Sequence, residues 1–145
     1  MRRAAAFSAA VFTAYFLGAI ASTQFILSNV ASMGLPVSFA NRLSASAHDL
    51  IGMATSYLPL IATGFLIAFA ITMGILKFLP NLRTTGYVLG GAVAVLALLL
   101  IMQSLFGMHP LPATRTTAGL IAQVLAGAAG GYIFVVLTRA PTARN

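Results

Sequence analysis

The sequence predicts an all-α integral membrane protein in which four transmembrane helices form an up-down bundle. Residues 4–41, 50–76, 84–114 and 116–138 carry no Lys, Arg, Asp or Glu, and a helix needs only about 20 apolar residues to cross the hydrocarbon. Hydrophobic residues make up 60% of the chain and the mean hydropathy is +1.00, which excludes a soluble fold. Since these stretches take up most of the 145 residues, we expect a single transmembrane domain over residues 1–145.

The first transmembrane helix is expected over residues 4–30. A secretory signal peptide is the alternative, because residues 19–21 have the pattern of a cleavage site. The apolar run continues past this site, however, which favours a retained helix. After Gly34 and Pro36, apolar residues recur at helical spacing among polar ones and predict a short interfacial helix on the outer surface; they are Val37, Ala40, Leu43 and Ala47.

The remaining helices are expected over residues 49–78, 86–106 and 116–137, and proline or glycine marks two of the ends. Pro80 follows the second helix and Gly107 follows the third. Proline cannot continue a hydrogen-bonded helix, and glycine favours the turn that ends one. The connections are short, so consecutive helices should lie antiparallel.

The basic residues predict an orientation, because short cytoplasmic loops of membrane proteins collect Lys and Arg. If four helices alternate in direction, only Arg42 and Arg115 fall on the outer side of the membrane. The other six basic residues fall on the opposite side. We therefore expect an inner-membrane, multi-pass protein with both termini in the cytoplasm. The residues on the cytoplasmic side would be Arg2, Arg3, Lys77, Arg83, Arg139 and Arg144.

Small residues predict where helices pack closely, because lipid gives helices no hydrophobic reason to associate. The fourth helix carries one stripe with Gly119, Gly127 and Gly131, and a second with Ala122, Ala126 and Gly130; the third helix begins with Gly86 and Gly90 at GxxxG spacing. Two interpretations stay open. The glycines could bring the third and fourth helices together within one chain, or they could form the seam of a homo-oligomer.

Asp49 is the single acidic residue, and its sequence context predicts a structural role. Ser46 precedes it by three positions, just before an apolar run, which is the spacing of a capping box. We expect Asp49 to cap the second transmembrane helix or to pair with Arg42 or Arg115. A direct role in transport is the alternative, since ionisable residues within membranes are often functional.

Polar residues within the helices predict a layer in the outer half of the bundle. Each lies about one to two turns from the outer end of its helix, at roughly 1.5 Å per residue. One interpretation is an interhelical hydrogen-bond layer; the other is an outward-open pocket for an anion or a lipid headgroup, rimmed by basic residues and histidines. The layer would contain Gln24, Ser56, Tyr57, Gln103 and Gln123, and its rim Arg42, His48, Asp49, His109 and Arg115.

Metal, cofactor and catalytic sites are not expected. His48 and His109 with nearby methionines would suit Cu(I), but methionine is also a common filler of apolar cores. One carboxylate cannot supply chemistry that needs two. Ser46, His48 and Asp49 are close neighbours in one helix-start sequence, without the strand-to-helix turn that exposes a catalytic serine.

The sequence therefore predicts a non-enzymatic inner-membrane protein that self-associates or serves as an accessory subunit of a membrane complex. The alternative is a small transporter or channel that binds a solute, an anion or a lipid headgroup at its outer face. The expected partners are the lipid bilayer and membrane-spanning chains, either further copies or other subunits. Nucleic acid is not expected, because the basic residues are scattered singly and at helix ends.

Overall fold

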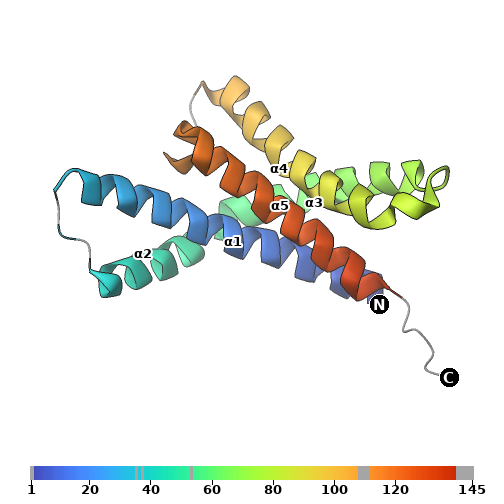
Figure 1. Cartoon of the computed structure of the whole chain (residues 1–145), viewed down its shortest axis with the longest axis horizontal. Coiled ribbons are helices and arrows are strands. Elements are labelled where there is room, and N and C mark those ends of the chain that lie inside the picture. Colours follow the sequence, from blue (N-terminus) through green and yellow to red (C-terminus); the bar gives the residue numbers. More distant parts are fainter. Residues whose placement is uncertain (1, 35, 37, 53, 108–111, 140–145) are drawn as a thin grey trace.

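The computed structural model describes residues 2–34, 36, 38–52, 54–107 and 112–139 and is all-helical there. Four helices are long and apolar enough to cross a membrane, and they pack together (Figure 1). They are α1 (Arg2–Ser32), α3 (Ala54–Ile75), α4 (Arg83–Phe106) and α5 (Thr117–Thr138), joined by the shorter α2 (Phe39–Gly52), η1 (Pro80–Leu82) and η2 (Pro112–Arg115). The predicted fold, four membrane-spanning helices with a short helix between the first two, is confirmed.

Helix α5 is the central element of the bundle. It packs against α1 on one side and α4 on the other, while α3 packs mainly against α4 and more lightly against α1 (Figure 1). The first residue of α1 reaches the last turn of α5, where Arg2 Nε donates to the Leu137 carbonyl at 3.2 Å. The two helices are therefore antiparallel, and their termini meet at one end of the molecule.

Glycine allows α5 to approach both neighbours at backbone distance. A Cβ atom added at Gly91 of α4 would collide with the carbonyl of Gly127, and one added at Gly131 would collide with the backbone of α4. On the other side of α5, a Cβ at Gly130 would lie 2.7 Å from the Ala10 carbonyl oxygen of α1. Both small-residue stripes of α5 are thus occupied by helices of the same chain.

The GxxxG pair of α4 faces a different neighbour from the one expected. Gly86 and Gly90 lie against α3, where a Cβ at Gly90 would come 2.7 Å from Thr72 Oγ1 and a Cβ at Gly86 would come 3.2 Å from Thr72 Cγ2. The close contact with α5 is made by the next residue, Gly91. One step along a helix turns the side-chain position by 100°, so adjacent glycines serve two different neighbours.

Aromatic rings join all four long helices in one layer. Phe69 of α3 has its ring centroid 6.2 Å from Phe7 of α1, 5.2 Å from Tyr87 of α4 and 4.7 Å from Phe134 of α5. Tyr87 and Phe134 are also 4.9 Å apart. These separations are those of favourable aromatic pairs, and the layer extends the hydrophobic core toward the Arg2 end of the bundle.

Helix α2 turns its polar side toward α1. Arg42 Nη1 donates to Gln24 Oε1 at 2.9 Å, Ser46 is buried, and the Tyr15 hydroxyl of α1 donates to the Leu50 carbonyl. The opposite side of α2 is apolar and exposed, as expected for a helix in contact with lipid at the membrane boundary. Its large exposed residues are Phe39, Leu43 and Ile51.

The predicted boundary between the short helix and the second span was wrong. Helix α2 continues through Ser46 and the Asp49 backbone to Gly52, and the second span begins at Ala54 and ends at Ile75. The Asp49 backbone therefore lies in the last turn of α2 and not at the start of the transmembrane helix. The apolar side of α2 extends from Phe39 to Ile51, so the amphipathic pattern continues the helix through the expected boundary.

The end of α4 and the start of α5 both have standard capping geometry. Gly107 adopts a left-handed conformation with φ of 63°, and its amide donates to the Gln103 carbonyl. This conformation ends α4 without strain because glycine has no Cβ. Thr116 caps α5 by accepting a hydrogen bond from the Gly119 amide at 3.1 Å. Gly119 itself is buried.

Candidate functional site

The residues of the predicted outer pocket whose side chains are described make their contacts at separate places. Tyr57 and Gln123 meet inside the bundle, Gln24 and Arg42 pair between α1 and α2, and Gln103 lies with Arg115 beside η2. Ser56 and His48 are exposed on α3 and α2. His109 lies outside the described residues, as does the Asp49 side chain.

The buried polar contact links three of the four long helices. Gln123 of α5 is 1% exposed. Its Nε2 donates to the Gly18 carbonyl of α1 at 2.8 Å, and its Oε1 accepts from the Tyr57 hydroxyl of α3 at 3.1 Å. The amide thus uses both of its polar atoms on neighbouring helices, which fixes their depth relative to one another.

Gly18 lies against this contact and was missed in the sequence. A Cβ at this position would lie 2.6 Å from Gln123 Oε1, so a larger residue would make the amide shift from its present position. The sequence signal was weak, because an isolated glycine in an apolar helix has no fixed meaning. The three-way contact contains no group that titrates near neutral pH. It is suited to hold helices together and unsuited to transfer protons.

The interior of the bundle is closed below this contact. Phe65 is fully buried, Ile61 and Val135 are 1% exposed, and the aromatic layer around Phe69 lies further toward the Arg2 end. Among the described residues, no buried side-chain nitrogen or oxygen lacks a hydrogen-bond partner. In the described part of the core, the fully enclosed polar groups are therefore engaged in contacts within the protein.

A small cavity of about 140 Å³ brings Gln103 and Arg115 together beside η2. Thr114 and Thr116 also line it, together with leucine side chains from α4 and α5. Ligand sites generally occupy about 300–1,000 Å³. This cavity has room only for a small ion or water.

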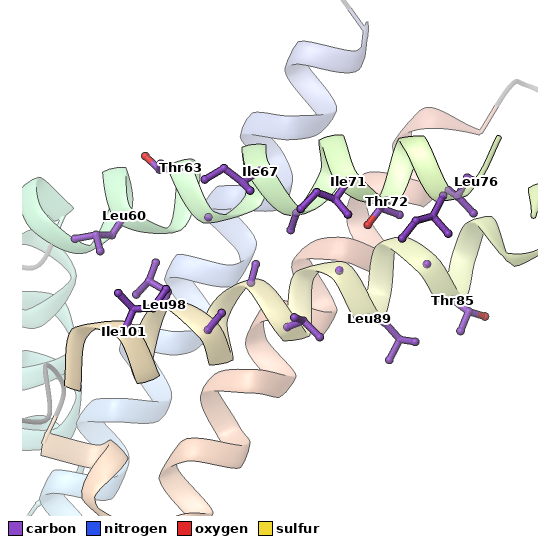
Figure 2. A pocket seen from close by; sticks show the side chains of 18 of the residues that line it. Leu60, Thr63, Ile67, Ile71, Thr72, Leu76, Thr85, Leu89, Leu98 and Ile101 are labelled. Atoms are coloured by element: carbon purple, nitrogen blue, oxygen red, sulfur yellow. The ribbon is translucent and has the colours of Figure 1, made fainter. Parts of the chain in front are cut away.

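A large hollow on the described structure is a groove between α3 and α4, which sequence reasoning did not predict. It encloses about 840 Å³ and is almost entirely aliphatic, as Figure 2 shows for Ile67, Ile71 and Leu89. The two helices come closest where their residues are small: a Cβ on Gly64 would lie 3.8 Å from the Ala94 carbonyl oxygen. Along the edges of the groove, large aliphatic side chains are exposed, among them Ile67, Ile71, Ile75, Leu89, Val93 and Ile101.

No protein-family model, curated protein or solved structure matches this chain.

Proposed function

We propose that the protein is a non-enzymatic accessory subunit of a larger membrane assembly, and that the groove between α3 and α4 receives a transmembrane helix of another chain. The proposal rests on this groove, which is apolar and runs along most of the length of α3. It lies between the two long helices with the smallest share of buried residues. We further propose an inner-membrane location with both termini in the cytoplasm, on the basis of the distribution of basic residues.

The uneven covering of the four helices supports an additional partner. In their most apolar 18-residue stretches, 39% of α1 residues and 33% of α5 residues are buried, but only 22% in α3 and in α4. Helices associate in lipid where small residues allow close packing. The groove offers such a surface, because Gly64, Ala68 and Ala97 lie between exposed isoleucine and leucine side chains.

The interior of the protein supports a structural role over a catalytic or transporting one. Gln123 forms hydrogen bonds with Gly18 and Tyr57, and aromatic rings fill the next layer. A water-filled route would need polar positions along the depth of the bundle. The described core instead provides contacts that hold helices in place.

A second candidate function, binding of a small anion at the Thr117 end of the bundle, rests on the cavity beside η2. Arg115 and Gln103 supply hydrogen-bond donors there. Leucine side chains of α4 and α5 bound the cavity. It would serve binding without passage across the membrane.

Native mass spectrometry after gentle extraction tests the subunit proposal. We expect unlike membrane chains to copurify with the protein. Two adjacent residues of α3 provide a matched pair of variants: Ile67 lines the groove and is 58% exposed, whereas Leu66 is 62% exposed and lies outside it. Ile67→Trp should release the partner and Leu66→Trp should retain it. Loss of the partner in both variants, or purification of the chain alone, would contradict the proposal.

The proposed orientation has its own test. Reporter fusions at Met1 and Asn145 should both report a cytoplasmic location. A signal from the opposite side at either terminus would refute the orientation and leave the groove argument unchanged.

A further inference from the structure

One buried hydroxyl group lies in the groove between α3 and α4. Thr72 of α3 lines this groove and is only 7% exposed. Its hydroxyl points across to α4, where a Cβ added at Gly90 would lie 2.7 Å from Thr72 Oγ1. Figure 2 shows this oxygen on the side of α3 that faces α4. Because position 90 is a glycine, no side chain from that position covers the hydroxyl.

Other threonines of the long helices satisfy their hydroxyls within their own helix. Those of Thr13, Thr23 and Thr63 each donate to the carbonyl oxygen four residues earlier, at 2.8, 3.0 and 2.9 Å. This bond is common for threonine in a helix. In the described part of the chain, no hydrogen bond involves the Thr72 hydroxyl. Every fully enclosed side-chain oxygen there has a partner, so the Thr72 oxygen is reached from the groove.

The surroundings of this hydroxyl are apolar. Thr72 lies within the candidate membrane span Ala54–Ile75, and its neighbours Ile71, Ile75 and Leu76 also line the groove. A hydroxyl without a hydrogen-bond partner is costly in an apolar environment. The hydrocarbon tails of lipids carry no group that could bond to it. A polar side chain on a helix that enters the groove would supply the missing partner.

We propose that the helix received by the groove carries a serine, threonine, asparagine or glutamine at the depth of Thr72, and that this side chain hydrogen-bonds the Thr72 hydroxyl. The inference rests on the proposed function, because it specifies which kind of helix the groove binds. A hydroxyl both donates and accepts, so each of these four side chains is a suitable partner. The bond would fix the position of the partner along α3, and the aliphatic edges of the groove would pack against its apolar residues.

The affinity of the partner tests the hydrogen bond. Dilution of the purified complex, followed by native mass spectrometry, gives the fraction of chains that retain the partner. Thr72→Val keeps the shape of the side chain and removes the hydroxyl. It should weaken binding about threefold, as expected for one interhelical hydrogen bond in a membrane protein. Thr72→Ser keeps the hydroxyl and should retain most of the affinity.

The control is Thr13→Val in α1, which removes a hydroxyl that is bonded within its own helix and lies outside the groove. It should bind the partner as the parent does. An equal loss of affinity in the two valine variants would refute the proposal, because the effect would then have no connection with the groove.

Crosslinking identifies the bound segment. A photoreactive residue at position 71, beside Thr72 in the groove, should form an adduct with a membrane-spanning segment of another chain. Mass spectrometry of that adduct should find one of the four polar residues within one helical turn of the crosslinked position. An entirely apolar segment at this position would overturn the inference and leave the groove as a helix-binding site.

Further outcomes separate this inference from the proposed function. If Thr72→Val bound the partner as tightly as the parent, the hydrogen bond would be excluded while the subunit proposal stood. Lipid adducts alone at position 71 would contradict both. Thermal melting of the isolated chain gives an independent check, since Thr72→Val should melt no lower than the parent. A lower melting temperature would show that the hydroxyl stabilises the bundle itself and is not kept for a partner.

Discussion

The two sides of α4 both carry glycines, but they pack differently against their neighbouring helices. Toward α5, Gly91 meets glycines, so the two backbones touch and the seam is closed. Toward α3, Gly86 and Gly90 meet the Thr72 and Leu76 side chains, and a groove of about 840 Å³ opens beside this contact. Glycine facing glycine brings the two backbones together at the α4–α5 seam, whereas a groove opens at the α3–α4 seam, where Gly86 and Gly90 face larger side chains.

The largest effect is expected where the closed seam is forced apart. Gly127→Leu would drive a side chain into the Gly91 backbone, and we expect a loss of about 3 kcal/mol in the free energy of unfolding, the upper end of the usual cost of overpacking. Thermal melting in detergent would measure it. Gly74→Leu is the matched control, because a Cβ at Gly74 meets no atom within 4 Å. If the Gly127 variant melted like the parent, close packing between α4 and α5 would not stabilise the bundle, which would contradict this explanation.

A smaller loss is expected when the buried hydrogen bonds are removed. Gln123→Leu leaves the Tyr57 hydroxyl and the Gly18 carbonyl without their interhelical partner. At about 0.6 kcal/mol for each such contact in membrane proteins, the loss should be about 1 kcal/mol. Gln103→Leu, at an exposed position, should leave stability nearly unchanged.

A double-mutant cycle with Tyr57→Phe assigns part of this loss to the Tyr57–Gln123 contact itself. Additive losses in the cycle would show that the two side chains do not depend on each other.

Alanine at the two adjacent glycines of α4 should separate its two sides. At Gly90 the added Cβ approaches Thr72 Oγ1, the end of a side chain that can rotate, whereas at Gly91 it meets backbone. Replacing glycine by alanine in a helix contributes about 1 kcal/mol through propensity. Gly90→Ala should therefore change the free energy of unfolding by less than about 0.5 kcal/mol, while Gly91→Ala should destabilise by about 1–3 kcal/mol. Equal effects at the two positions would show that the two seams are packed alike.

The smallest effect on stability is expected inside the groove. Ile67→Trp and Leu66→Trp each change an exposed side chain, so each should shift the free energy of unfolding of the isolated chain by less than about 0.5 kcal/mol. Destabilisation by Ile67→Trp alone would mean that the groove is part of the closed core. Any loss of partner in that variant would then follow from unfolding of the bundle.

The fold could be predicted from the sequence because the feature that identifies a membrane-spanning helix is the length of an uncharged stretch. Uncharged stretches longer than the hydrocarbon thickness identify helices such as α3 and α5 regardless of which way they face. The local start of α3 was predicted wrongly, since Ser46 and Asp49 have the spacing of a cap but lie inside α2. A capping pattern competes with the amphipathic pattern that continues through it, and the packing of α2 on α1 decides between them.

The candidate site was harder to predict, because helices in lipid are apolar on all sides. Periodicity then gives no core-facing side, so the sequence assigned Gly86 and Gly90 to the wrong neighbour and missed Gly18 and the groove. Gln123 stood out as a polar residue at depth, but its partners come from helices far apart in the chain. Only the crossing of α1, α3 and α5 determines them.

Photo-crosslinking in native membranes tests the proposed role of the groove most directly. A photoreactive residue at position 67, inside the groove, should crosslink to one unlike membrane chain and give a single defined adduct. The same residue at position 66, outside the groove on the adjacent face of α3, should give only lipid adducts. Lipid adducts alone at both positions, or the same protein adduct at both, would contradict the account.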